Sequence, residues 1–204
     1  MTARSIILLR HGVTDWNHGG RFQGHADIPL NDAGREQARA VNALLAGAGI
    51  TCAVSSDLSR AAETAQLVTS GWGIPVKSDT RLREVDVGSW AGMNVEDIGR
   101  TESDFWPAIR EGRDFRRSPT GESATESGQR VALAVLDHAE VATDAEVLLV
   151  VGHGLSLRVG ALLLMGLDYS HARLFAGLIN CHWMVLSPGE DHWRLRSYNV
   201  GATG

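Results

Sequence analysis

Short apolar runs alternate along the chain with longer segments in which apolar residues recur at helical spacing. Four of the short runs predict strands, at Ser5–Leu9, Ala53–Ser55, Pro75–Lys77 and Glu146–Gly152. The first and the fourth are the most apolar, so we expect them at the centre of a sheet. Strands that alternate with helices are typical of a three-layer α/β/α fold with a mostly parallel central sheet.

The segments between the strands predict four helices. Residues suited to N-capping precede two of them, Asn31 before the first and Ser56 or Asp57 before the second. The predicted helices extend from Asn31 to Leu45, from Leu58 to about Ser70, from Gly121 to about Thr143 and from His153 to about Met165. Near the C-terminus, Cys181–Ser187 and Trp193–Tyr198 predict a hairpin that adds one antiparallel edge strand.

The segment from about 83 to 125 departs from this alternation. It is rich in charge, glycine and tryptophan, with helical fragments at Val95–Gly99 and Glu102–Glu111. Long irregular insertions in compact domains are often lids or binding loops. We therefore expect a small cap insertion that faces the substrate, with Trp90 and Trp106 as candidates to touch it.

Composition narrows the class of protein. A chain of 204 residues, 44% of them apolar, can form one domain over 1–204 with one substantial core. The net charge of −5 and the absence of a long basic run give no sign of nucleic-acid binding. No apolar run is long enough for a signal peptide or a membrane span. Cys52 and Cys181 lack metal-ligand spacing and fit a reduced, cytoplasmic setting. The expected partner is a small molecule, and a homodimer is one option for the oligomeric state.

Polar residues that suit phosphate follow the two most apolar predicted strands. Arg10 and His11 come directly after the first, and His153 stands between two glycines after the fourth. The carboxyl ends of strands in an α/β sheet are where ligands bind. A guanidinium offers a fork of donors to phosphate oxygens, and its charge keeps a nearby imidazole neutral and nucleophilic. Arg60, in the first turn of a helix, and Glu84, in a charged loop, would add a second cation and an acid. Taken alone, Arg10, His11, Arg60 and Glu84 are each compatible with a solvated side chain, whereas a histidine between two glycines at a strand end favours a functional role.

Six separate sequence motifs follow one another between Leu9 and at least Leu157. They are Arg10-His11-Gly12-x-Thr14-x-Trp16-Asn17, Phe22-Gln23-Gly24-x-x-Asp27-x-Pro29-Leu30, Ser55-x-Asp57-Leu58-x-Arg60-Ala61-x-x-Thr64-Ala65, Leu82-x-Glu84-x-x-x-Gly88-x-Trp90-x-Gly92, Gly121-Glu122-Ser123 and Gly152-His153-Gly154. Together they resemble the histidine phosphatase superfamily, in the branch that contains cofactor-dependent phosphoglycerate mutase. Several blocks in the right order are far more specific than one tripeptide.

The resemblance implies roles for these residues. His11 would be the nucleophile that becomes phosphorylated, and Glu84 would donate a proton to the leaving oxygen. The implied phosphate pocket consists of Arg10, Arg60 and His153, lined by Asn17, Gln23, Gly24 and Gly154. With this much fixed positive charge we expect no metal and no cofactor. Asp86 and Glu122 are rival acids, but the family's spacing favours Glu84. A related branch has an aspartate directly after the second histidine, and Gly154 here excludes that branch.

The same phosphohistidine serves hydrolases and mutases. The Phe22–Leu30 block is similar to the phosphatase form, and the cap is shorter than that of mutases. We therefore predict a metal-independent phosphomonoesterase that acts on a small metabolite such as a sugar or sugar-acid phosphate. Arg116 and Arg117 resemble the paired arginines that hold a substrate carboxylate in mutases, which makes them candidate substrate contacts and a mutase the alternative. A non-catalytic phosphate-binding protein would have no use for a nucleophile and an acid.

Overall fold

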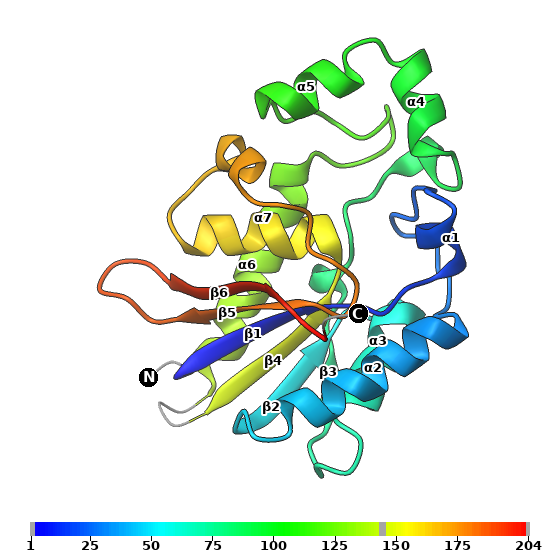
Figure 1. The fold of residues 1–204 in the computed structure, drawn as a ribbon. Coiled ribbons are helices and arrows are strands. Elements are labelled where there is room, and N and C mark those ends of the chain that lie inside the picture. Colours follow the sequence, from blue (N-terminus) through cyan, green and yellow to red (C-terminus); the bar gives the residue numbers. More distant parts are fainter. Residues whose placement is uncertain (1–2, 143–145, 203–204) are drawn as a thin grey trace.

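A mixed six-stranded sheet forms the centre of the molecule (Figure 1). The computed structural model describes residues 3–142 and 146–202. The strands are β1 (Ser5–Arg10), β2 (Ile50–Ser55), β3 (Val76–Ser78), β4 (Val147–Gly152), β5 (Trp183–Ser187) and β6 (Arg194–Val200), in the order β3-β2-β4-β1-β5-β6. The first four are parallel, and β5 pairs antiparallel with both β1 and β6. The predicted α/β fold with β1 and β4 at the centre is confirmed. The strand of opposite direction is β5, one position inside the edge, because the hairpin places β6 outside it.

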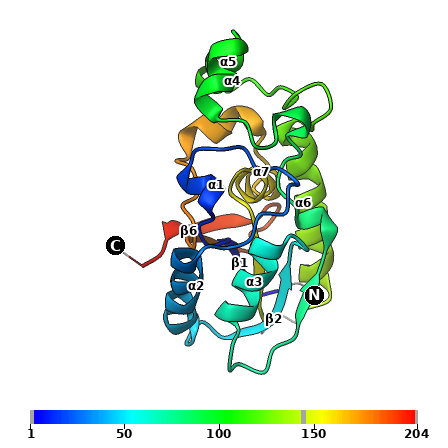
Figure 2. The same ribbon diagram turned by 90° about the vertical axis from the view of Figure 1, so that its right-hand side faces the viewer.

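Helices cover both faces of the sheet (Figure 2). They are α1 (Asp15–His18), α2 (Asp32–Leu45), α3 (Ser59–Val68), α4 (Val95–Thr101), α5 (Phe105–Glu111), α6 (Ala124–Glu140) and α7 (Gly154–Leu164). Short 3₁₀ helices lie at Thr80–Leu82, Gly88–Trp90 and Tyr169–Leu174. In the described part of the chain, no helix combines the length and the apolar character that crossing a membrane requires. The predicted end of α6 near Thr143 lies outside the described residues, and the helix itself ends at Glu140.

The N-terminal caps confirm one prediction and correct another. The Asn31 side chain accepts from the Gly34 N–H and caps α2 as predicted. Neither Ser56 nor Asp57 caps α3, which begins at Ser59 after Leu58. The Asp57 carboxylate binds Arg83 instead, and the Ser59 N–H donates to Asp27 at 2.7 Å. The capping carboxylate of α3 therefore comes from another segment of the chain.

Alternation along β1 and β4 explains the three layers. Successive side chains on a strand point to opposite faces, so each buried strand supplies two cores. On one face, residues of β1 and β4 pack against α6 and α7: Ile6, Leu8, Leu148, Val150, Val131, Val135, Leu157 and Ala161. On the other face they pack against α2 and α3: Ile7, Leu9, Leu149, Val151, Ala38, Val41, Ala61 and Ala65. A strand with apolar residues at every position is therefore the expected pattern for this sheet.

The loop after β1 touches the start of α2 backbone to backbone. A Cβ on Gly12 would lie 2.4 Å from the Gly34 carbonyl oxygen, and one on Gly34 would lie 2.2 Å from the Val13 carbonyl oxygen. Only glycine permits so close an approach. The Val13 N–H also donates to Gln37 of α2 at 2.9 Å. These contacts fix the backbone directly after His11.

The segment 83–125 carries α4 and α5 beyond the carboxyl edge of the sheet (Figure 1). Its aromatic residues Trp90, Phe105, Trp106 and Phe115 form a small core together with Phe22 from the chain after α1. Trp90 is 8% exposed and packs against Phe22 and Phe105. Backbone hydrogen bonds between Phe22 and the turn at Gly92 and Met93 join this segment to the chain after α1.

Candidate active site

The register of β1 and β4 brings the two predicted site histidines together. Arg10 pairs with Gly152, so His11 and His153 leave the sheet side by side. Their ring centroids lie 5.1 Å apart in an edge-on arrangement. Both side chains are buried, with His153 fully so. Two imidazoles at the carboxyl edge of the sheet thus share one small site, as strand-end geometry predicts.

His11 is held in one tautomer. Its Nδ1 lies 2.6 Å from the Gly12 carbonyl oxygen. A carbonyl only accepts, so Nδ1 carries the hydrogen and Nε2 keeps the lone pair. Burial, and then the charges of Arg10 and Arg60, hold the pKa of His11 well below its ordinary 6.5. The ring is therefore neutral at neutral pH, with Nε2 as a nucleophile.

Two arginines carry the positive charge of the site. Arg60 is 1% exposed and donates to the Gly24 and Ala26 carbonyls, both at 2.8 Å. Burial lowers its pKa to about 10, so it stays charged at neutral pH. Arg10 donates to the Leu178 carbonyl at 2.6 Å, and burial lowers its pKa as well. Within the described residues, the Nε of each guanidinium is buried without a hydrogen-bond partner. Charged donors without protein acceptors favour a bound anion.

His153 has a different environment from His11. Its Nε2 lies 3.0 Å from the Ser56 hydroxyl, and its buried Nδ1 has no partner within the described part of the protein. Burial, followed by the charge of Arg60, holds the pKa of His153 well below 6.5. Ser56 follows β2, so a third strand end contributes to the site. Ser56 was predicted only as a possible helix cap and not as a site residue, although its position after a predicted strand is the signal that finds it.

Glu84 lies at the N-terminus of α7. One carboxylate oxygen accepts from the N–H groups of Val85 and Ser156, both at 2.9 Å, and the other accepts from Leu155 at 3.2 Å. Negative charge is stabilised at this end of a helix. A Cβ on Gly154 would lie 3.1 Å from the Arg10 Nε, so glycine lets the start of α7 approach that guanidinium. Glu84 and Arg10 are thus held around the same helix start.

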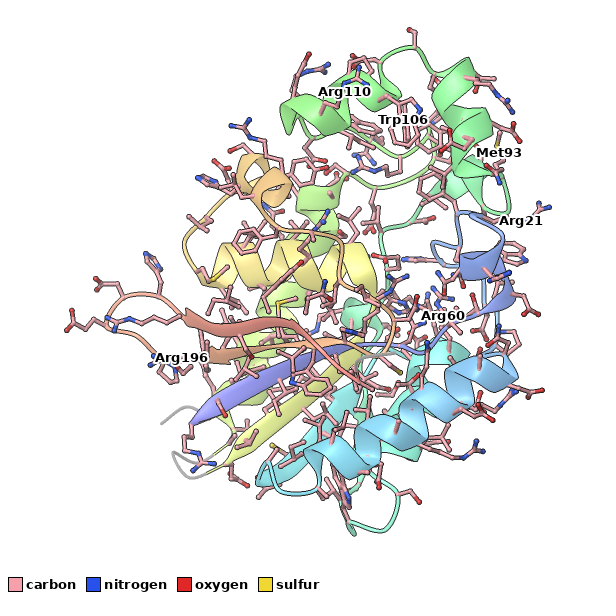
Figure 3. All side chains as sticks on the ribbon, in the orientation of Figure 1. Arg21, Arg60, Met93, Trp106, Arg110 and Arg196 are labelled. Carbon is pink, nitrogen blue, oxygen red and sulfur yellow. The ribbon has the colours of Figure 1, made fainter. Side chains whose placement is uncertain are left out.

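A cavity of about 170 Å³ collects most of the predicted residues. Its lining consists of Arg10, His11, Asn17, Arg21, Phe22, Gln23, Arg60, Glu84, Val85, Val87, Arg117 and Leu155. Arg60 lies at the ends of the strands below the cap, whereas Trp106 and Arg110 lie on the cap itself (Figure 3). Gly24 does not line this cavity, but its carbonyl accepts from Arg60 at 2.8 Å. Its φ is +52°, and a Cβ there would lie 2.6 Å from a Val87 methyl group.

Other predicted residues lie elsewhere. Arg116 does not line this cavity: its guanidinium pairs with Glu126 at 2.6 Å and faces a separate hollow on the cap, which Trp90 also lines. Trp106 lines neither, because it packs on Phe105 with ring centroids 4.9 Å apart. The rival acids Asp86 and Glu122 are also absent from the lining of the His11 cavity.

Several lining residues have no chemical signal in the sequence. Phe22, Val85 and Val87 supply apolar walls, and Arg21 lines the cavity while donating to the Gly92 carbonyl at 2.9 Å. Such residues depend on how the segment 83–125 folds back over the strand ends. Proximity to predicted site residues, as for Phe22 beside Gln23, is the one signal available.

Comparison with known proteins identifies the class. The sequence profile of the histidine phosphatase superfamily (branch 1) matches residues 6–201, so the chain belongs to that family. The predicted family and the predicted enzyme class, a phosphoric monoester hydrolase, are confirmed.

Some of the proteins similar to this chain are named as mutases and others as phosphatases. A probable phosphoglycerate mutase of Yersinia pestis is 32% identical over 199 residues, which cover 98% of this chain and 92% of that protein. A mycobacterial glucosyl-3-phosphoglycerate phosphatase, solved with VO3, is 32% identical with a TM-score of 0.89 and covers 97% of this chain and 100% of its own. A putative alpha-ribazole-5'-P phosphatase of Escherichia coli is 28% identical with a TM-score of 0.84, covering 99% and 98%.

Proposed function

We propose that this protein is a metal-independent phosphomonoesterase that works through a phosphohistidine at His11. One observation carries the proposal: the His11 Nδ1 is committed to the Gly12 carbonyl at 2.6 Å, so Nε2 keeps its lone pair in a site that also holds the charges of Arg10 and Arg60. Phosphoryl transfer requires in-line attack, neutralised phosphate oxygens and a protonated leaving group. The residues that line the cavity provide each of these.

The reaction has two steps. The Nε2 of His11 attacks phosphorus, and the bond from phosphorus to the leaving oxygen breaks as Glu84 gives that oxygen a proton. Three backbone N–H groups stabilise the carboxylate of Glu84, so the proton comes to it with the substrate, because the negative charge of the bound phosphate favours the protonated acid. Water then attacks phosphorus, Glu84 accepts a proton from it, and the bond to Nε2 breaks to release phosphate. Arg10 and Arg60 neutralise the phosphate oxygens in both steps, and His153 completes the phosphate pocket.

The substrate we propose is a small sugar or sugar-acid phosphate. The cavity is small, and its apolar walls at Phe22 and Val87 leave room beside the phosphate for a compact leaving group. Arg117 lines the same cavity and can bind an acid group of the substrate. The two similar structures are named as phosphatases of glucosyl-3-phosphoglycerate and of alpha-ribazole-5'-P, and small phosphorylated metabolites of this kind support the class.

A phosphoglycerate mutase is the alternative function. Arg117 in the cavity and the mutase name of the similar Yersinia protein favour it. Interconversion of 3-phosphoglycerate, primed with 2,3-bisphosphoglycerate, at a rate equal to or above hydrolysis would establish the mutase instead.

The test of the phosphatase is turnover of p-nitrophenyl phosphate with and without a chelator, combined with trapping of the phosphoenzyme. We expect unchanged turnover in chelator and an acid-labile, base-stable phosphoryl group on His11. Loss of turnover in chelator, or a label on another residue, would overturn the proposal.

Three further properties of the protein are predicted from the sequence alone. They are the single domain over 1–204 with a substrate cap at 83–125, the cytoplasmic setting and the homodimer. Cys52 and Cys181 are free thiols in the structure, as a reduced setting requires.

A further inference from the structure

One side chain of α6 uses all of its donors on the loop that carries Glu84 and on the neighbouring Glu122. Arg130 NH1 donates to the carbonyls of Arg81 at 2.8 Å and Arg83 at 2.6 Å, and NH2 donates to the carbonyl of Glu84 at 2.6 Å. Its Nε and NH2 also bind the two oxygens of Glu122, at 3.0 and 2.7 Å. A guanidinium has five N–H donors, and each of these five bonds can take one. A lysine offers three donors without this planar fork and cannot make the same set.

Glu122 links Arg130 to the backbone on the C-terminal side of Glu84. One of its carboxylate oxygens accepts from the Asp86 N–H at 2.9 Å, and its own N–H donates to the Asp86 carbonyl at 2.7 Å. Although burial raises it, hydrogen bonds from Arg130 and Asp86 hold the pKa of Glu122 below its ordinary value. Arg130 and Glu122 therefore bind the backbone on both sides of Glu84.

The side chain of Glu84 is held from a different direction. Its carboxylate accepts from the first turn of α7, while its backbone carbonyl accepts from Arg130 of α6 and from the Nε2 of His25 at 2.8 Å. Neither Arg130 nor Glu122 lines the cavity that contains His11. Their hydrogen bonds reach the site through Glu84 and its loop, and a lysine at position 130 would keep the positive charge that also acts on His153.

We infer that Arg130, together with Glu122, is a positioning residue that holds Glu84 at the place where its proton reaches the leaving oxygen. This inference rests on the proposed function of Glu84. Proton transfer needs the donor within about 2.6–3.2 Å of its target, and a misplacement of about 1 Å can cost about 10²-fold in rate. Leaving groups that depart without a proton tolerate that misplacement, and alkoxides do not.

The experiment compares leaving groups in the variant Arg130→Lys. We expect kcat/KM, which reports on the first step alone, to fall by about 10- to 100-fold for alkyl phosphates and to change by less than about threefold for p-nitrophenyl phosphate. Inhibition by inorganic phosphate should be unchanged. Arg81→Lys is the matched control, because the Arg81 guanidinium binds Asp79 and Asp137, away from the backbone at Glu84. This control should show no dependence on the leaving group. Equal losses for all substrates in Arg130→Lys would mean a structural role alone and would overturn the inference.

Glu84→Gln separates this inference from the proposed function. If Arg130 acts through Glu84, the double variant Glu84→Gln/Arg130→Lys should match Glu84→Gln on alkyl phosphates, whereas independent roles would make the losses multiply. Without leaving-group dependence in Glu84→Gln, the proposed acid itself is wrong. If Glu84→Gln shows leaving-group dependence and Arg130→Lys does not, only the positioning role of Arg130 is wrong. If Arg130→Lys fails to fold, Glu122→Gln replaces it, with a smaller loss in the same direction expected and uniform losses again excluding the role.

Discussion

Charged side chains are buried in the pocket at the carboxyl edge of the sheet, whereas most of those on the cap above it are exposed to solvent. In the pocket, Arg60 is 1% exposed and His11 3%, so their charge and hydrogen bonding act in a medium that excludes water. On the cap, Arg113 binds Asp104 and Glu111, and all three side chains are about half exposed or more. Exposed ion pairs contribute only about 0–1 kcal/mol, while buried charges interact far more strongly with a bound anion.

This difference in exposure suggests that the pocket determines the phosphate chemistry and the cap determines the substrate specificity. The proposed nucleophile and phosphate-binding cations lie at strand ends and at the start of a helix that packs on the sheet. The cap packs around a separate aromatic core, formed by Trp90, Phe105, Trp106 and Phe115 together with Phe22 from the chain after α1. Exposed cap residues can therefore change with little effect on phosphate chemistry, whereas changes in the pocket cannot.

The largest effect should come from removing the nucleophile. We expect His11→Ala to lower kcat on p-nitrophenyl phosphate by about 10⁴-fold or more, since loss of a covalent nucleophile removes the first step. His171→Ala is the control, because His171 is exposed and pairs with Asp168. Steady-state rates and phosphoenzyme trapping measure both variants. Retained phosphoenzyme in His11→Ala would identify another nucleophile.

Next in size is the contrast between a pocket arginine and a cap arginine. Arg60→Gln should lower kcat/KM by about 10²- to 10³-fold, as expected for loss of a preorganised charge on the transferring group. Arg100→Gln removes an exposed pair with Asp97 and should change kcat/KM less than about twofold. Similar losses in the two variants would contradict the separation of chemistry from specificity.

The free energy of unfolding should decrease as the pH is lowered, because both site histidines are buried and neutral in the fold. Their pKa values are well below 6.5 in the fold and near 6.5 in the unfolded chain. Below pH 6.5 the unfolded chain therefore binds more protons, which favours unfolding by about 1.4 kcal/mol per pH unit for each histidine. Urea unfolding between pH 5 and 8 measures the slope. His153→Asn should remove about half of the slope between pH 5 and 6.5, and His171→Gln should leave it unchanged.

The smallest effect distinguishes two adjacent arginines. Arg117→Met should raise KM for 3-phosphoglycerate by about tenfold, the loss of one charged hydrogen bond, and leave p-nitrophenyl phosphate nearly unaffected. Arg116→Met should change neither, because Arg116 binds Glu126 outside the cavity. Melting temperatures check that Arg117→Met, which also loses a contact with Tyr169, stays folded. A larger effect at Arg116 would place the acid group of the substrate in the cap hollow.

Much of the site could be predicted because its chemistry stands at strand ends. Continuous apolar runs predicted β1 and β4, and their parallel pairing brings His11 and His153 together without further information. The difference between Arg116 and Arg117 could not be predicted, since it depends on a turn at Ser118 with φ +72° and on a partner ten residues away. The prediction of Ser56 or Asp57 as the cap of α3 was wrong for a similar reason.

Arg130 shows the same limit at longer range. In the sequence it is one arginine in a helix, and such residues are mostly solvated. Its acceptors lie up to 49 residues away, on the loop that carries Glu84. Only the tertiary fold brings a complete set of acceptors to that guanidinium.

The central position of β1 has a consequence for how the protein is made. The first strand to be synthesised pairs only with β4 and β5, which begin at Val147 and Trp183. Contacts of such sequence separation form slowly, because a long loop must close before they do. A nascent chain therefore carries Arg10 and His11 unpaired until most of its length has left the ribosome. We therefore expect the edge that carries Arg10 and His11 to be among the last features to form, and a chain that ends before β4 to lack it.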